Sequence, residues 1–122
     1  MAACSTAAFS WVVATLARAA PGSVERVEVL ALRVELHVPA ATSLKAKRQV
    51  VKSLVDTARH RYGVAAAEVD NQDLWQRASV GFAAVAGEAA HVTEVIDSVE
   101  RYVWSIPEVD VIDVVRTWLE EQ

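Results

Sequence analysis

The chain has 122 residues, of which 53% are hydrophobic and 23% charged, so its composition is that of one globular domain and excludes a disordered chain. Its one cysteine, Cys4, excludes an intramolecular disulfide framework and a zinc site built from cysteines. The net charge of −4, taken as a whole, argues against a typical basic nucleic-acid-binding protein.

Residues 1–24 differ in composition from the rest, and we interpret them as an N-terminal extension that is appended or partly disordered. Their apolar run, Ala7–Leu16, is shorter than the roughly 20 residues that span a bilayer, so no membrane segment is expected. Ala17-Arg18-Ala19 has the form of a signal-peptide cleavage site, but no Lys or Arg precedes the apolar run. The domain itself is expected over residues 25–122.

The first half of the domain predicts a strand followed by a helix. Apolar and polar residues alternate from about residue 27 to residue 38, which is typical of a half-buried strand, and Pro39 ends it. Ser43 is a suitable N-cap for the helix and Gly63 a suitable C-terminal residue. The apolar positions of one helix face are Val51, Leu54, Val55, Ala58 and Tyr62.

The second half predicts two strands, a helix and a last strand. Residues 64–69 and 77–86 form a hairpin, the helix follows Gly87-Glu88, Pro107 marks its end, and residues 109–118 form the last strand. The order βαββαβ predicts an α+β, ferredoxin-like fold, with two helices packed on one face of a four-stranded antiparallel sheet. The other face carries polar residues of the first strand, Arg33, Glu35 and His37.

Charge is divided unevenly along the chain. Residues 44–62 carry a net charge of +5, which leaves −9 for all other residues. Lys45, Lys47 and Arg48 lie in the first turn of the helix, where the macrodipole disfavours cations and where free N–H groups suit a phosphate. A solvated basic face that pairs with the acidic second helix is the alternative explanation.

The expected topology places the connection over residues 70–77 beside the start of the basic helix. Trp75 in this polar loop either stacks on a nucleic-acid base or folds back over the core. The anion- or RNA-binding candidates are Ser43, Lys45, Lys47, Arg48, Lys52, Trp75, Gln76 and Arg77.

No catalytic residue, metal site or cofactor is predicted. Glu68 and Asp70 read as a carboxylate pair on one face of a strand, which solvation at the rim of the hairpin explains better than acid–base catalysis. The sequence contains no glycine-rich phosphate loop, nucleophile elbow or Cys–His pair.

Two motifs carry a family resemblance. The run SLKAKRQVVKSL over residues 43–54 and the pair AEV at 67–69 with DLWQRA at 73–78 resemble the signatures of the bacterial YlxP-like family of uncharacterised proteins. The resemblance covers about residues 27–119 and implies a ferredoxin-like fold. Members are commonly encoded beside genes of translation initiation and ribosome maturation, which implies a cytoplasmic role near the ribosome. It brings no catalytic residues.

Three functions remain open from the sequence. The first is a non-enzymatic cytoplasmic domain that binds RNA or ribosomal components through the basic helix and the Trp75 loop. The second is a homo-oligomeric protein-interaction module that uses the open sheet face or an edge strand. The third is a small-anion sensor or enzyme in which Arg48 and Arg77 hold the anion.

Overall fold

The elements follow one another in the order βαββαβ. The computed structural model describes residues 26–119, so the interpretation of residues 1–24 lies outside the described part of the chain. The elements are β1 (Glu28–His37), α2 (Leu44–Tyr62), β2 (Ala65–Asp70), β3 (Arg77–Ala86), α3 (Ala89–Trp104) and β4 (Asp110–Trp118). The predicted α+β, ferredoxin-like fold is confirmed.

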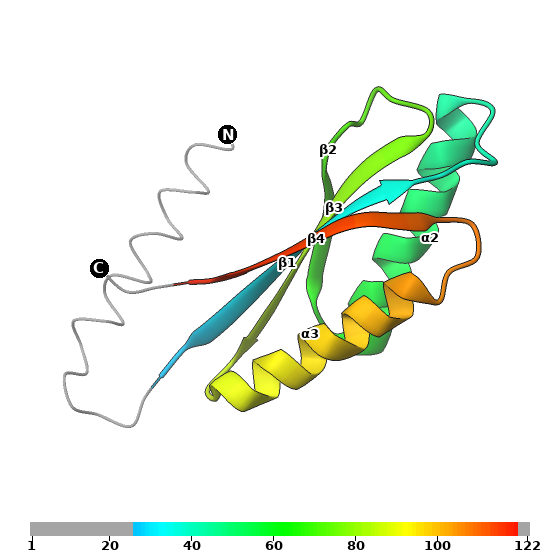
Figure 1. The fold of residues 1–122 in the computed structure, drawn as a ribbon. Coiled ribbons are helices and arrows are strands. Elements are labelled where there is room, and N and C mark those ends of the chain that lie inside the picture. Colours follow the sequence, from blue (N-terminus) through cyan, green and yellow to red (C-terminus); the bar gives the residue numbers. More distant parts are fainter. Residues whose placement is uncertain (1–25, 120–122) are drawn as a thin grey trace, which may run out of the picture.

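The four strands form one antiparallel sheet in the order β2-β3-β1-β4. Alternation along β1 sends every second side chain toward the helices, and α2 and α3 cover that one face of the sheet (Figure 1). The core between the layers includes Leu30, Leu32, Val34 and Leu36 of β1, Val80 and Phe82 of β3, Leu54 and Ala58 of α2, and Ile96 and Val99 of α3. Between residues 26 and 119, no helix combines the length and the apolar character that crossing a membrane requires.

Both predicted ends of α2 are confirmed. Ser43 has an extended backbone, and its Oγ accepts a hydrogen bond of 3.1 Å from the N–H of Ala46, as an N-cap does. Gly63 lies in the left-handed region with φ 66° and donates its N–H to the carbonyl of Arg59 at 3.2 Å. The start of α2 is therefore fixed directly after the connection from β1.

A β-bulge separates two carboxylates that the sequence pattern placed on one face of β2. The pairing of β2 with β3 shifts between Glu68 and Asp70. Glu68 contacts the helix side of the sheet, whereas Asp70 lies 3.6 Å from Arg33 on the open face, measured from Oδ2 to Nη2. The prediction of a carboxylate pair on one strand face is wrong, because the extra residue of a bulge reverses the alternation of side chains.

Candidate nucleic-acid interface

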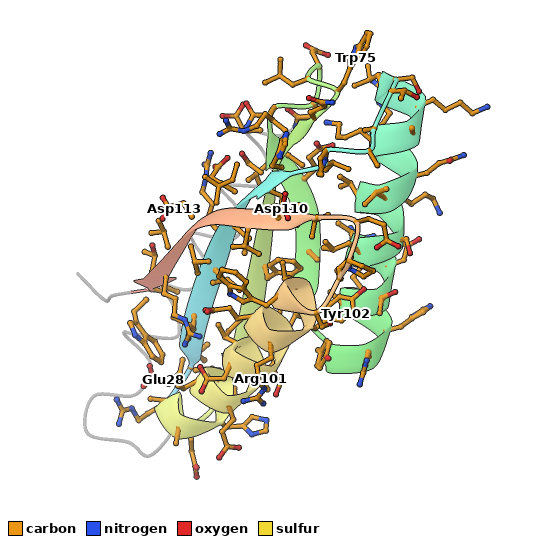
Figure 2. All side chains as sticks on the ribbon, turned by 45° about the vertical axis from the view of Figure 1, so that its right-hand side comes forward. Glu28, Trp75, Arg101, Tyr102, Asp110 and Asp113 are labelled. Atoms are coloured by element: carbon orange, nitrogen blue, oxygen red, sulfur yellow. The ribbon has the colours of Figure 1, made fainter. Side chains whose placement is uncertain are left out.

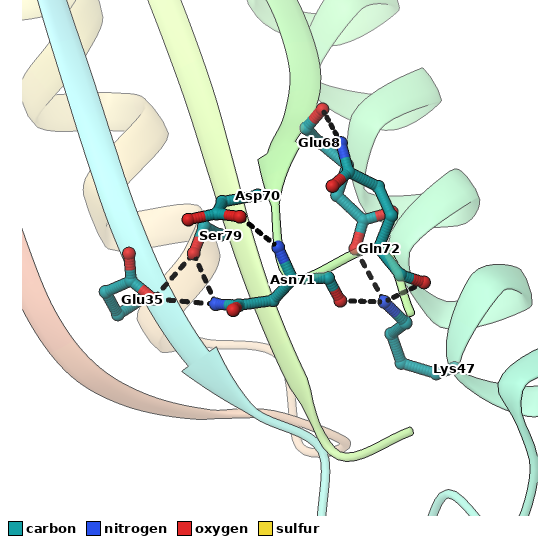
Figure 3. A network of polar contacts seen from close by, with 7 residues as sticks. All are labelled: Glu35, Lys47, Glu68, Asp70, Asn71, Gln72 and Ser79. Carbon is teal, nitrogen blue, oxygen red and sulfur yellow. Dashed lines mark hydrogen bonds and ion pairs between the residues drawn. The ribbon is translucent and has the colours of Figure 1, made fainter. Parts of the chain in front are cut away.

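Lys47 lies in the first turn of α2 and is completely buried, with an exposed fraction of 0%. Its Nζ donates to Oε2 of Glu68 at 2.7 Å, to the carbonyl of Asn71 at 2.9 Å and to the carbonyl of Gln72 at 3.3 Å (Figure 3). A lysine ammonium has three N–H donors, so all of them are used inside the protein. This corrects the prediction that Lys47 meets a phosphate, since its charge does not reach the surface.

Asn71 links this buried lysine to the open face of the sheet. Its carbonyl accepts from Lys47, while its side-chain Nδ2 donates to Oγ of Ser79 at 2.8 Å and to Oε2 of Glu35 at 3.4 Å (Figure 3). Asn71 has a positive φ of 63°, a conformation that asparagine adopts more readily than most residues. The backbone after the β2 bulge is therefore held from both sides of the sheet.

The carboxylate of Glu35 ends this network. The pKa of Glu35 lies below its ordinary value of 4.5, chiefly because the hydroxyl of Ser79 donates to it at 2.6 Å. Burial opposes this shift, and the positive charges of Arg33 and Arg77 reinforce it. The charged form of Glu35 is thus the form that the network stabilises.

Gln76 and Ser43, both predicted binding residues, hold the loop and the helix in place. The side-chain Nε2 of Gln76 donates to the carbonyls of Pro39 at 3.2 Å and Ala41 at 3.4 Å. The backbone carbonyl of Gln76 accepts from the N–H of Val38 at 2.9 Å. These bonds tie the 70–77 connection to the segment between β1 and α2. With Ser43 occupied as the N-cap, both side chains position the surface on which a ligand would lie.

The predicted binding residues that are exposed and not used to hold the loop include three cations of α2 and the indole of Trp75. Lys45, Arg48 and Lys52 are exposed, and Trp75 is 57% exposed. Trp75 stands at the end of the molecule beside the start of α2, so it does not close the core (Figure 2). Lys52 pairs with Asp56 at 3.1 Å, but both side chains are largely exposed and such pairs are weak.

Arg77 is not brought together with the cations of α2. Arg77 lies opposite His37 in the register of β3 and β1, and its positive charge helps to lower the pKa of Glu35. Its side chain therefore belongs to the open face of the sheet. Arg48 belongs to the helix layer on the other side. The two arginines thus belong to opposite layers of the fold, and an anion site that uses both stays a prediction.

Within residues 26–119, the strands place no Phe, Tyr or Trp on the open face, since Trp118 of β4 lies opposite the core residue Leu30. Among residues 26–119, the buried Phe82 is the only phenylalanine, and its side chain lies on the helix side of the sheet. The middle of the open face is a shallow hollow of about 410 Å³, lined largely by small and apolar side chains that include Ala31, Ala67, Gly81, Ala83 and Val115. Base stacking on the sheet, as RNA-recognition modules use it, lacks its aromatic residues on this face.

No group of three or more His, Cys, Asp and Glu side chains within residues 26–119 lies close enough to hold a metal ion. The sequence pattern missed the roles of Glu68, Asn71 and Ser79 in the polar network. One signal was available for its central residue. Lys47 lies four residues before Val51, on the same side of the helix as the apolar stripe.

Four antiparallel strands with two helices on one face define a ferredoxin-like α+β domain, and here Lys45, Arg48 and Trp75 are exposed at the start of α2 and in the loop before β3. Residues 29–116 match the family described as "Protein of unknown function (DUF503)", and the chain belongs to that family. It is 34% identical over 70 residues to the "Uncharacterized protein YlxP" of Bacillus subtilis (strain 168), which covers 57% of this chain and 76% of that protein. The resemblance that the two motifs predicted is confirmed.

Proposed function

We propose that this protein is a non-enzymatic cytoplasmic domain that binds RNA, alone or within ribosomal particles, at the start of α2 and the Trp75 loop. The observation that carries the proposal is the exposed indole of Trp75 in a loop that Lys47 and Gln76 tie to the start of α2, where Lys45 and Arg48 are exposed. Cations meet phosphates without regard to sequence, and an aromatic face stacks on any base. The combination suits a single-stranded segment of RNA.

Rigidity of the loop supports the proposal. The buried ammonium of Lys47 donates to two carbonyls of the loop backbone, and the side chain of Gln76 ties the loop to the segment before α2. A loop that is ordered before binding loses less conformational entropy when a ligand arrives. Each stacked base contributes about 1–3 kcal/mol, so one prepositioned indole has a measurable share of the affinity.

A filter-binding titration with a single-stranded RNA over a range of salt concentrations tests this proposal. We expect the double variant Lys45→Gln with Arg48→Gln to reduce the salt slope by about two, and Trp75→Ala to weaken binding at every salt concentration. The control is Arg26→Gln, an exposed arginine just before β1 that pairs with Glu28 at 2.9 Å and lies outside the proposed surface. Absence of RNA affinity at low salt, or an equal loss in the control, would overturn the proposal.

The second candidate function is self-association, in which a second copy of the chain packs on the open face of the sheet. The apolar hollow of this face is flanked by Val69 and Val115, which are 47% and 49% exposed, and no element within residues 26–119 covers it. Apolar patches of this kind mark interaction surfaces.

Sedimentation velocity at several protein concentrations tests this candidate. We expect a dimer that Val115→Glu dissociates, while Trp104→Gln on the helix side leaves it intact. A monomer at every concentration would contradict self-association.

A further inference from the structure

A polar cleft lies between α2 and α3, away from the Trp75 loop. Its volume is about 380 Å³, which falls within the range of small-molecule sites, roughly 300–1,000 Å³. Arg101 and Tyr102, both labelled on α3 in Figure 2, belong to its lining. The complete lining is Arg61, Tyr62, Ser98, Arg101, Tyr102 and Ser105.

Aromatic contacts hold the two sides of this cleft together. The rings of Tyr62 and Tyr102 lie 5.7 Å apart at a tilt of 47°. The guanidinium of Arg61 lies over the ring of Tyr62 at 5.4 Å, and Nη2 of Arg101 donates to Oγ of Ser98 at 3.2 Å. Both guanidinium groups are therefore positioned at the cleft by neighbouring side chains.

The cleft holds two positive charges without a carboxylate in its lining. Within residues 26–119, neither Arg61 nor Arg101 lies within ion-pair distance of an acidic group. The acids of α3 that would balance them, Asp97 and Glu100, instead pair with Arg116 of β4 at 2.8 and 2.9 Å. Both carboxylates are thereby engaged with Arg116 on the β4 side of α3, and neither pairs with Arg61 or Arg101.

Helix dipoles explain only part of this arrangement. A cation near the C-terminal end of a helix is favourable, and Arg61 and Arg101 each lie in the last turn of their helix. The dipoles do not explain why both cations line the same cleft, where like charges repel one another. An anion between them removes that repulsion.

We propose that this cleft binds a phosphate group between Arg61 and Arg101. A guanidinium presents paired N–H donors that match two oxygens of a phosphate, and the phenolic O–H of Tyr102 is a further donor in the lining. The hydroxyl of Ser98 donates to the carbonyl of Glu94, so the serine supports Arg101 and leaves recognition of the anion to the other groups.

The phosphate can belong to a small phosphorylated molecule or to the backbone of a nucleic acid, since the same donors recognise both. The cleft is separate from the RNA interface proposed above. Lys45 and Arg61 lie near opposite ends of α2, about 24 Å apart at 1.5 Å per residue. Binding here therefore does not depend on the Trp75 loop.

The test is a titration of the full-length protein with inorganic pyrophosphate, followed by NMR on the arginine Nε–H groups. We expect saturable shifts at Arg61 and Arg101, and a loss of affinity of about tenfold or more in the double variant Arg61→Gln with Arg101→Gln. Arg101→Lys keeps the positive charge but lacks the paired N–H donors of a guanidinium, so it is expected to lose part of the affinity for pyrophosphate. The control, Arg26→Gln, removes an exposed arginine that lies outside both proposed surfaces and is expected to bind pyrophosphate as the wild type does.

A second arm uses a single-stranded RNA with the same variants and distinguishes the two sources of phosphate. Weaker RNA binding in Arg61→Gln with Arg101→Gln, without pyrophosphate binding to the wild type, would assign the cleft to backbone phosphate. Pyrophosphate binding that this double variant weakens, with RNA binding unchanged, would assign it to small phosphorylated molecules. The proposal is overturned if the double variant weakens neither probe, or if the control weakens pyrophosphate binding equally.

Discussion

Basic residues at the start of α2 lie in two different regions, the solvent-exposed surface of the helix and the buried interior beneath the loop. Lys45 and Arg48 extend into solvent, whereas Lys47, between them in sequence, is enclosed beneath the loop with all its N–H donors engaged. The buried lysine organises the backbone, and its neighbours are left free to meet a ligand. A run of basic residues is therefore not a count of available charges, and each cation has to be placed before it is assigned a role.

Removing the buried amine is expected to have the largest effect on stability. Lys47→Met keeps the alkyl packing but leaves the carboxylate of Glu68 and two carbonyls without their donor. Breaking a buried ion pair costs about 3–5 kcal/mol, and because the side chain of Glu68 is still 16% exposed, we expect about 3 kcal/mol. Urea unfolding of the two proteins measures the difference.

The matched control for this variant is Lys45→Met, which we expect to change the free energy of unfolding by less than about 0.5 kcal/mol. Adding Glu68→Gln to Lys47→Met removes the unpaired charge and is expected to restore part of the stability. If Lys47→Met cost no more than the control, the distinction between the interior and the surface of this turn would fail.

Asn71 is the next most sensitive position, because it supplies both a positive φ and a bridging side chain. Asn71→Gly accepts the backbone angle but loses the bond to Ser79, so we expect a loss of about 1 kcal/mol. Asn71→Ala also strains the backbone, which brings the loss to about 2 kcal/mol. Thermal unfolding of the two variants separates the contributions, and equal losses would show that the backbone angle contributes nothing.

The regular parts of this fold were predictable because local periodicity and global burial agree. Alternation along β1, the caps Ser43 and Gly63, and the apolar face of α2 all indicated the elements that the structure contains. The family resemblance rests on two motifs, and these coincide with the start of α2 and the loop before β3. The secondary-structure elements and their topology could therefore be predicted from the sequence.

The polar network was not predictable in the same way. Lys47 occupies a position on the apolar stripe of α2, but its burial depends on Glu68, which is distant in sequence. The bulge that turns Asp70 to the open face leaves no pattern in six residues of β2. Whether Trp75 faced inward or outward depended on how tightly the loop is tied, which only the bonds of Gln76 reveal.

Protonation of Glu35 at acidic pH is expected to weaken the polar network and to lower the free energy of unfolding. The pKa of Glu35 is lower in the folded protein than its ordinary value of 4.5, because Ser79 donates to its carboxylate. The stability this provides is fully present above about pH 4.5 and is lost as the pH falls through the lowered pKa. Glu35→Gln should therefore flatten the pH dependence of the free energy of unfolding in that range, measured by urea titrations at successive pH values.

The control for the pH experiment is Glu94→Gln, an exposed carboxylate of α3 that forms no ion pair within residues 26–119. It should leave the acid-induced loss of stability as it is in the wild type. A Glu35→Gln profile parallel to the wild-type profile would contradict the role given to Glu35.

The smallest effect is expected at Lys52, an exposed cation of α2 that pairs with a carboxylate of the same helix. Its bond of 3.1 Å to Asp56 spans i,i+4, but the two side chains are 79% and 47% exposed, so solvent and salt screen the pair. A double-mutant cycle with Lys52→Gln and Asp56→Asn should give a coupling of about 0.3–0.5 kcal/mol that disappears at high salt. A coupling above about 1 kcal/mol that persists in salt would place Lys52 with Lys47 among the structural cations, and the basic surface open to a ligand would then shrink to Lys45 and Arg48.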